Sequence, residues 1–242
     1  MKGAPRSLQL SVVIPCWNEA ANLPALLAAW TALWRAGDSW ELILVDNGST
    51  DGSAALLADA ARQLPFLRVA TVPPPNIGYG HGILTGLQLA RGDVLAWTHA
   101  DGQTPPADVL RAWAAWRDSP SPLKTIVKGR RRARPLADAA FTAGMSAWAS
   151  ALLATPLHDI NAQPKLFPRA LLADFADPPQ DLSLDVYLLW LARRHGYATQ
   201  TIDVIFGARA HGQSRWATSL PARVRAVRRT IGLLWRLRGR VA

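Results

Sequence analysis

Cysteine is almost absent from this 242-residue sequence, which has Cys16 alone. A single cysteine excludes a disulfide within the chain and is compatible with a reducing compartment. The first nine residues lack an apolar run of signal-peptide length, so we expect no export by that route. Hydrophobic residues make up 50% of the chain. This excludes a disordered protein and allows one large domain with a buried core.

Acidic residues are absent from residues 217–242, which contain seven arginines and account for most of the net charge of +10. A second basic cluster covers residues 128–134. Such clusters attract nucleic acid, anionic lipid headgroups or phosphorylated substrates, and composition does not choose among them. Aromatic residues do not alternate with these basic residues as on a known base-stacking module, so we expect no nucleic-acid partner.

The C-terminal arginines accompany an apolar pattern with helical spacing. Leu220, Val224, Val227, Ile231 and Leu234 share one face, which predicts a basic amphipathic helix over residues 217–242. Such a helix either docks on the domain with its arginines in solvent or attaches to an anionic membrane surface, and the two are compatible.

Charged residues are also absent from Ala139–Leu157, a run of 19 residues that is long enough for a membrane span. The run is rich in alanine, serine, threonine and glycine, and Pro156 lies near its end. Its apolar character is therefore weak. We expect a buried or interface-lying helix rather than a span.

Apolar runs alternate with segments of helical spacing through the first hundred residues. The predicted strands are Leu8–Pro15, Glu41–Val45, Leu67–Val72 and Val94–Trp97. The predicted helices are Asn18–Arg35, Ser53–Gln63 and Ile83–Ala90. Later elements are a helix at Pro106–Asp118, a strand at Leu123–Val127, a helix at Leu182–His195 and a strand at Thr199–Phe206. This alternation predicts an α/β fold with a Rossmann-like, mostly parallel sheet and covering helices.

Ligand-capable side chains follow the strand Val94–Trp97. His99, Asp101 and Gln103 stand at alternate positions, so an extended segment points them the same way. Imidazole and oxygen donors on one face suit a divalent cation that also holds phosphate. The alternative is a polar loop that caps the strand.

Three other polar loops follow predicted strands, at residues 15–19, 46–49 and 76–80. The carboxyl ends of parallel strands lie on one edge, so these loops and residues 99–103 should converge on one crevice. Asp46 can accept hydrogen bonds from a base or ribose, and the glycines at 78, 80 and 82 allow phosphate to approach a helix N-terminus. The chain lacks the GxGxxG fingerprint after its first strand and lacks a P-loop, which excludes those two nucleotide-binding modes.

Four motifs stand in order along the chain: Leu10–Glu19, Leu44–Gly52, Asn76–Gly80 and the Ala90–Asp93 run. Together they resemble the motifs of the family 2 glycosyltransferases with a GT-A fold. Further motifs resemble the dolichol-phosphate mannose synthase branch of that family, and the likeness covers roughly residues 8–216. These are Asp159–Arg169, Ser183–Val186, Gly196–Tyr197 and His211–Trp216.

The resemblance implies a role for each matching position. Pro15, Asn18, Glu19, Asp46 and Asn47 would bind the nucleoside of a UDP- or GDP-hexose donor, beside the loop that contains Gly78. Asp101 would be the principal ligand of Mn²⁺ or Mg²⁺, and Gln103 a second metal contact. His99 stands where the family usually has an aspartate. An imidazole favours Mn²⁺ over Mg²⁺ and removes one negative charge, and His99 is otherwise a non-coordinating residue at the strand end.

The acceptor determines which further groups are needed. An ionised lipid phosphate needs basic side chains to position it, and Arg130, Arg131, Lys165 and Arg169 are the candidates. Lys165 and Arg169 are otherwise ordinary surface charges. A sugar hydroxyl would instead need a general base, and the catalytic candidates Asp159 and Asp185 stay equivalent at this stage.

The sequence therefore predicts an inverting, metal-dependent hexosyltransferase that acts on a polyprenyl phosphate or a surface glycan. We expect a nucleotide-sugar half at about residues 8–105 and an acceptor half at about 106–216, followed by the C-terminal helix. The enzyme would lie at the inner face of the cytoplasmic membrane, and it could act there beside an integral membrane protein. The alternatives are the same fold with a soluble saccharide or protein acceptor, and a nucleotide- or glycan-binding member without turnover.

Overall fold

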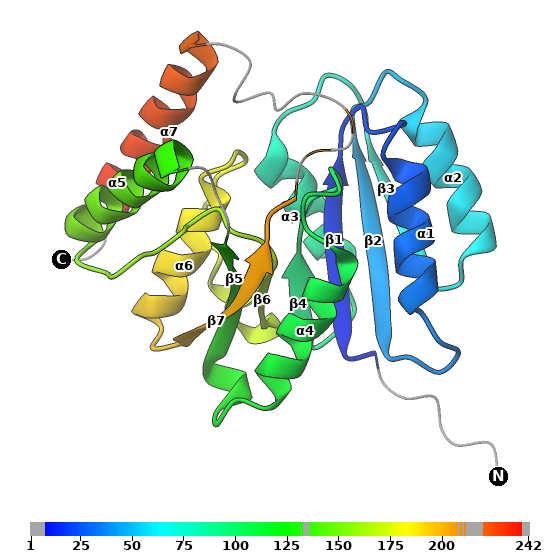
Figure 1. The fold of residues 1–242 in the computed structure, drawn as a ribbon, viewed down its shortest axis with the longest axis horizontal. Coiled ribbons are helices and arrows are strands. Elements are labelled where there is room, and N and C mark those ends of the chain that lie inside the picture. Colours follow the sequence, from blue (N-terminus) through cyan, green and yellow to red (C-terminus); the bar gives the residue numbers. More distant parts are fainter. Residues whose placement is uncertain (1–7, 133–135, 208, 210, 212–219, 239–242) are drawn as a thin grey trace.

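The computed structural model describes residues 8–132, 136–207, 209, 211 and 220–238, which form a seven-stranded sheet with helices on both faces (Figure 1). The strands are β1 (Leu10–Cys16), β2 (Trp40–Asn47), β3 (Leu67–Val72), β4 (Val94–Trp97), β5 (Thr125–Arg132), β6 (Lys165–Pro168) and β7 (Ala198–Ile205). The helices are α1 (Leu23–Leu33), α2 (Ser53–Gln63), α3 (Tyr79–Leu89), α4 (Pro106–Arg117), α5 (Leu136–Leu153), α6 (Leu184–Arg194) and α7 (Leu220–Arg238). Short 3₁₀ helices cover Pro122–Lys124 and Arg169–Asp174. The predicted α/β architecture is confirmed.

The strands follow the order β3-β2-β1-β4-β6-β5-β7. The strands β3, β2, β1 and β4 are parallel, as predicted, and β5 is parallel to β7. Between these two groups lies β6, which is antiparallel to both β4 and β5. The sequence pattern did not predict β6, because its only apolar residues, Leu166 and Phe167, stand between Lys165 and Pro168 and form no apolar run. The sheet is therefore mostly parallel, with one reversed strand at the boundary between its halves.

Alternate residues of β1 enter two separate cores. Val12 and Ile14 pack with Trp30 of α1, whereas Val13 packs on the other face with Ile83 of α3, and all five are fully buried. A strand directs successive side chains to opposite faces, so a continuous apolar run indicates helices on both sides. The central strands are therefore covered on both faces.

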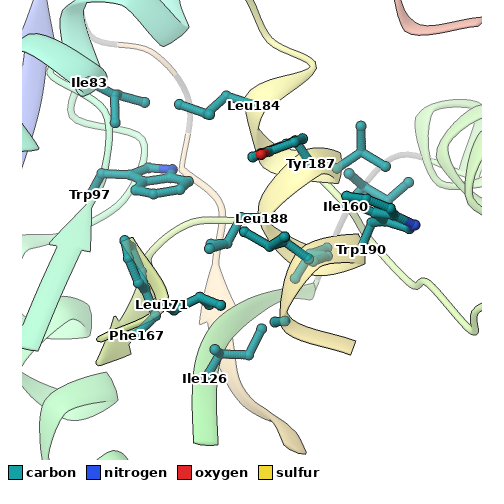
Figure 2. Packing of buried hydrophobic residues seen from close by; sticks show 14 of the residues in the cluster. Ile83, Trp97, Ile126, Ile160, Phe167, Leu171, Leu184, Tyr187, Leu188 and Trp190 are labelled. Atoms are coloured by element: carbon teal, nitrogen blue, oxygen red, sulfur yellow. The ribbon is translucent and has the colours of Figure 1, made fainter. Parts of the chain in front are cut away.

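Aromatic residues anchor the sheet to α6. Trp97 of β4 and Phe167 of β6 meet edge to face, with ring centroids 5.4 Å apart. Leu184 and Leu188 of α6 lie opposite them in the same cluster (Figure 2). Edge-to-face pairs add about 0.5–1.5 kcal/mol beyond the area that they bury. This packing fixes the carboxyl end of β4, where the candidate site begins.

The first helix begins later than the sequence suggested. Asn18 is not its N-cap, since α1 starts at Leu23 and Asn18 has a positive φ of 53°. Asparagine tolerates this left-handed conformation better than most residues. Residues 18–22 instead form a separate loop at the end of β1.

The helix α5 begins before the predicted range and ends at Leu153. None of the helices that the structure describes combines the length and apolar character needed to cross a bilayer. The helices α5 and α7 lie side by side (Figure 1). Leu233, Leu234 and Leu237 of α7 are buried in the same core cluster as α6. The expected boundary between residues 216 and 217 lies outside the described residues.

Candidate active site

A cleft of about 570 Å³ opens at the carboxyl ends of β1, β2 and β4. All four predicted polar loops contribute to it. The register pairs Cys16 with Asp46, which aligns the ends of β1 and β2 and explains the convergence. The sequence-predicted residues that line the cleft are Pro15, Asn18, Glu19, Asn47, Gly78, His99, Asp101 and Gln103.

Hydrogen bonds hold the loop after β1 against the loop after β2. The Asn18 backbone N–H donates to Ser49 Oγ at 3.0 Å, and the Asn18 side-chain Oδ1 accepts from the Thr50 N–H at 2.8 Å. The Glu19 N–H donates to Ser53 Oγ at 2.9 Å. Burial raises the pKa of Glu19 above its usual range. One wall of the cleft is thus preorganised by contacts between residues about thirty positions apart.

Asp46 and Asn47 act at the end of β2 in different ways. Asp46 is 2% exposed, and its Oδ1 accepts from the Ser49 N–H at 3.1 Å, so its carboxylate shapes the turn beneath the cleft. The Asn47 Nδ2 donates to the Gly78 carbonyl at 2.7 Å and connects β2 to the loop before α3. Asn47 therefore lines the cleft, while Asp46 supports it from behind.

Glycines let the start of α3 approach the segment before α6. A Cβ at Gly80 would lie 2.6 Å from the Pro179 carbonyl oxygen and 2.8 Å from that of Asp181. Both neighbours are backbone atoms, which cannot move aside as a flexible side chain can. These glycines therefore have a packing role in addition to the phosphate role that their pattern suggested.

We expect Gly80→Ala to lower the free energy of unfolding by about 1–3 kcal/mol, because the methyl group overpacks this contact. It should also weaken nucleotide binding, since Asp181 lines the cleft. Urea denaturation and calorimetry measure the two effects. The control is Gly144→Ala on α5, where nothing lies within 4 Å of the added Cβ. That variant should gain up to about 1 kcal/mol of stability. Equal stability of the two variants would contradict the steric explanation.

Asp101 lines the cleft and is 5% exposed. Its Oδ1 accepts from the Gln103 N–H at 3.1 Å, and its Oδ2 accepts from Arg209 Nη2 at 2.7 Å. The His99 ring lies 5.3 Å from the Tyr79 ring. Burial lowers the pKa of His99 below its usual value, although the Asp101 carboxylate opposes this. The imidazole is therefore neutral at neutral pH and keeps a lone pair.

These residues fit a metal that arrives with a phosphate ligand. In the part of the chain that the structure describes, no three His, Cys, Asp or Glu side chains gather into a metal site. Divalent cations at phosphate-transfer sites commonly take one or two protein carboxylates and obtain other ligands from the substrate and water. Asp101 supplies a buried carboxylate and His99 a neutral imidazole. These residues would therefore hold a divalent cation only together with a bound diphosphate, which supplies further ligands.

The sequence reasoning missed residues after β7 that contact the cleft loops, among which Arg209 lines the cleft. Gly207 and Gln103 exchange two hydrogen bonds of 3.0 Å, and Arg209 binds Asp101. The His211 carbonyl accepts from Asn22 at 3.3 Å. His211 is the first residue of the His211–Trp216 motif, and the other residues of that motif lie outside the described residues. Asp181 and Arg229 were also missed, whereas Trp17 and Tyr79 belong to the predicted loops but were given no role of their own.

Asp185 lies beneath the cleft and is fully buried. Its Oδ1 accepts from Trp97 Nε1 at 3.0 Å and from Gln163 Nε2 at 3.1 Å, and it lies 3.4 Å from Lys165 Nζ. The Gln163 amide also donates to the Tyr79 hydroxyl, which connects this network to the cleft wall. Asp185 is absent from the cleft lining. In this position it supports the cleft rather than facing an acceptor.

Asp159 is held by Arg131. The Arg131 backbone N–H and Nε donate to the two carboxylate oxygens at 2.8 and 2.9 Å. Burial raises the pKa of Asp159, but the hydrogen bonds and charge of Arg131 more than offset this and place it below the usual range. Burial, followed by the charge of Lys165, lowers the pKa of the neighbouring Lys128 to about 7.

Two acceptor candidates do not occupy the positions expected of them. Lys165 is fully buried beside Asp185, so it is not a surface charge and is not accessible to an acceptor. Arg169 donates to the carbonyls of Gly92 and Asp93 through its Nε and backbone N–H. Those residues precede β4, whereas the cleft lies at the other end of that strand. The reversed direction of β6 carries Arg169 away from the cleft.

Residues 11–152, more than half of the chain, match the model of glycosyl transferase family 2. The chain belongs to this family. The undecaprenyl-phosphate 4-deoxy-4-formamido-L-arabinose transferase of Aeromonas hydrophila is 32% identical to this family 2 chain over 214 residues, which are 86% of the chain and 62% of that protein. The Pseudomonas paraeruginosa protein of the same name is 43% identical over 112 residues, 46% of the chain and 33% of that protein. The chain thus spans less than two thirds of these relatives.

Solved structures share the fold of this family 2 chain. Glucosyl-3-phosphoglycerate synthase from Mycobacterium tuberculosis, in complex with Mn²⁺, UDP and glucosyl-3-phosphoglycerate, matches with a TM-score of 0.73 at 22% identity, over 96% of this chain and 80% of that one. A mannosyltransferase from Pyrobaculum calidifontis in complex with GDP-Man and Mn²⁺ has a TM-score of 0.60 at 22% identity, over 87% of this chain and 61% of that one. The GT-A fold suggested by the motifs is confirmed.

Proposed function

We propose that this chain transfers a hexose from a nucleoside diphosphate sugar to the phosphate of a polyprenyl lipid, with inversion at the anomeric carbon. The observation that carries this proposal is the convergence of four polar loops around the buried carboxylate of Asp101. The names of the relatives support a polyprenyl phosphate acceptor. The fold shared with proteins that bind UDP or GDP-mannose together with Mn²⁺ supports the donor class.

The donor would occupy the cleft with its nucleoside against the ends of β1 and β2. Pro15, Asn18, Glu19 and Asn47 line that part of the cleft. Asp46 would act indirectly, because its carboxylate holds the turn at Ser49. The diphosphate would then lie toward Asp101, at the end of β4.

A divalent cation bound with the donor, Mn²⁺ or Mg²⁺, would neutralise the charge that develops on the diphosphate as the glycosidic bond breaks. Asp101 would be its principal protein ligand, with Gln103 and His99 beside it. Arg209 donates a hydrogen bond to Asp101 at 2.7 Å, and its positive charge balances the negative charge of that carboxylate. It is placed to meet the phosphate oxygens as well.

Each candidate general base is already paired with a basic side chain, which supports a phosphate acceptor. Asp159 is engaged by Arg131, and Asp185 by Lys165. A phosphate oxygen is already ionised at neutral pH and needs no base, unlike a sugar hydroxyl. Arg131 also lies 5.4 Å from the ring of Phe206, which directly precedes Gly207 and its two hydrogen bonds to Gln103. Among the four predicted acceptor-binding residues, Arg131 and the half-exposed Arg130 are therefore better placed than Lys165 and Arg169.

Attachment to the inner face of the cytoplasmic membrane is part of the proposal. Arg228, Arg229 and Arg236 of α7 are exposed, and Trp235 between them is 55% exposed. Trp148 of the adjacent α5 is 38% exposed. Exposed tryptophan beside arginine suits the headgroup region of an anionic membrane.

The test is a transfer assay with labelled UDP- and GDP-hexoses, each with Mn²⁺ and with chelator. Acceptors are undecaprenyl phosphate in vesicles and soluble saccharides. We expect metal-dependent transfer to the lipid phosphate alone, and the active donor would identify the base. Transfer to a soluble saccharide without lipid would contradict the acceptor assignment. Nucleotide binding without transfer to either acceptor would favour a binding protein.

A further inference from the structure

A groove of about 540 Å³ lies between α7 and the segment before α6. Three arginines line it, Arg228, Arg229 and Arg236, and Asp181 is the one acidic residue among its described lining residues. The groove is therefore strongly positive. It is separate from the donor cleft, although Asp181 and Arg229 line both.

The groove follows from the spacing of residues on α7. Arg228, Gly232 and Arg236 stand four residues apart and so share one side of the helix. Nothing lies within 4 Å of a Cβ added to Gly232. The glycine thus leaves open space with an arginine one turn, about 5 Å, on either side of it.

The arginines of the groove have unused hydrogen-bonding capacity. Within the described part of the chain, Arg228 and Arg236 form no ion pair, and Arg229 lies 3.9 Å from Asp181. The helix is nonetheless fixed in position, because Leu233 is buried and Thr230 shares a 3.3 Å hydrogen bond with Ser183. Ser183 also precedes the N-terminus of α6, whose positive dipole end favours an anion. Arginines that a docked helix presents around an open space form a receptive site for phosphate.

We propose that this groove binds the phosphate group of a membrane lipid and thereby holds the donor cleft at the membrane surface. The inference deepens the proposed function, because it rests on the membrane attachment stated there. Two lipids offer the same chemistry, an acidic phospholipid and a polyprenyl phosphate. Since Arg229 lies between groove and cleft, a lipid bound here would be next to the donor.

The experiment measures binding of the full chain to phosphatidylcholine vesicles by sedimentation, with no sugar nucleotide present. One set contains phosphatidylglycerol, a second contains undecaprenyl phosphate, and a third contains phosphatidylcholine alone. Arg236→Gln removes a groove arginine. Arg238→Gln is the matched control, because Arg238 belongs to the same helix, stacks on Trp235 and does not line the groove.

Gly232→Leu is the second variant, since it fills the groove and leaves every arginine in place. We expect Arg236→Gln to weaken binding by about ten- to a hundredfold, as for loss of a charge-assisted hydrogen bond. Arg238→Gln should cost about fivefold, the contribution of one charge near an anionic surface. Gly232→Leu should weaken vesicle binding by at least about tenfold, in the range expected for Arg236→Gln.

Selective loss on phosphatidylglycerol vesicles would identify a phospholipid site, and selective loss on undecaprenyl phosphate would identify a site for the acceptor class. Loss on both would identify recognition of the phosphate group itself. Equal losses for Arg236→Gln and Arg238→Gln, unchanged binding by Gly232→Leu, or no binding by the unaltered chain would each overturn the proposal. Sugar transfer is measured separately, so intact transfer with such a result would refute the groove alone.

Discussion

Asp101→Asn is expected to lower the turnover number of sugar transfer by about three orders of magnitude. Stabilisation of leaving-group charge by a bound cation supplies several kcal/mol, and each 1.4 kcal/mol corresponds to about a tenfold change in rate. Asparagine keeps the shape of the side chain and can still accept from the Gln103 N–H. The variant therefore removes the charge that is proposed to hold the cation and keeps the hydrogen bond to the Gln103 N–H.

The measurement combines turnover with calorimetric titration of UDP and GDP, each with Mn²⁺, Mg²⁺ or chelator. In the unaltered chain the metal should strengthen nucleotide binding, and in Asp101→Asn this gain should disappear. Asp118→Asn is the control, because Asp118 is exposed at the end of α4 and does not line the cleft. Metal-dependent binding that persists in Asp101→Asn would remove Asp101 from the metal site.

The carboxyl edge of the sheet could be predicted because each contributing loop lies next to its own strand. Asn18, Asn47, Gly78 and Asp101 each lie within six residues of the end of an apolar run, and parallel strands end on a common edge. Local sequence was therefore sufficient to place them together. The alternation of strands and helices likewise predicted the mostly parallel sheet with covering helices.

Residues that enter the cleft from distant segments had no such local signal. Arg209 meets Asp101 across 108 positions. Asp181 reaches the cleft because Gly78 and Gly80 allow the segment before α6 to approach α3. Arg229 depends on the docking of α7. These contacts arise from packing between segments, which hydrophobic periodicity does not describe.

The misplaced acceptor residues have one shared cause, the strand β6. Charged side chains are rarely buried, so Lys165 was expected at the surface. In the sheet, Lys165 pairs with Trp97, and Arg169 then lies at the opposite end of β4. A charged residue at the start of a short strand gives no sign of burial, because its partner Asp185 belongs to a helix twenty residues later.

Lys165→Met should lower the free energy of unfolding by about 3–5 kcal/mol. The Lys165 and Asp185 side chains are both fully buried, and removing one member leaves an uncompensated charge in the interior. The Ala162 carbonyl also loses the Lys165 Nζ–H that it accepts at 2.8 Å. Methionine fills a similar volume, so the loss reports charge and hydrogen bonding rather than a cavity. Urea denaturation followed by circular dichroism measures it.

The double variant Lys165→Met with Asp185→Asn separates the ion pair from the rest of the network. Asparagine can still accept from Trp97 and Gln163, so both charges are removed while those hydrogen bonds are kept. We expect the double variant to be more stable than the sum of the two single losses predicts, by about 1–3 kcal/mol. Lys124→Met, at an exposed lysine, should change stability by about 0.5 kcal/mol or less. Strict additivity would mean that Lys165 and Asp185 do not stabilise each other, and that Asp185 depends on Trp97 and Gln163 instead.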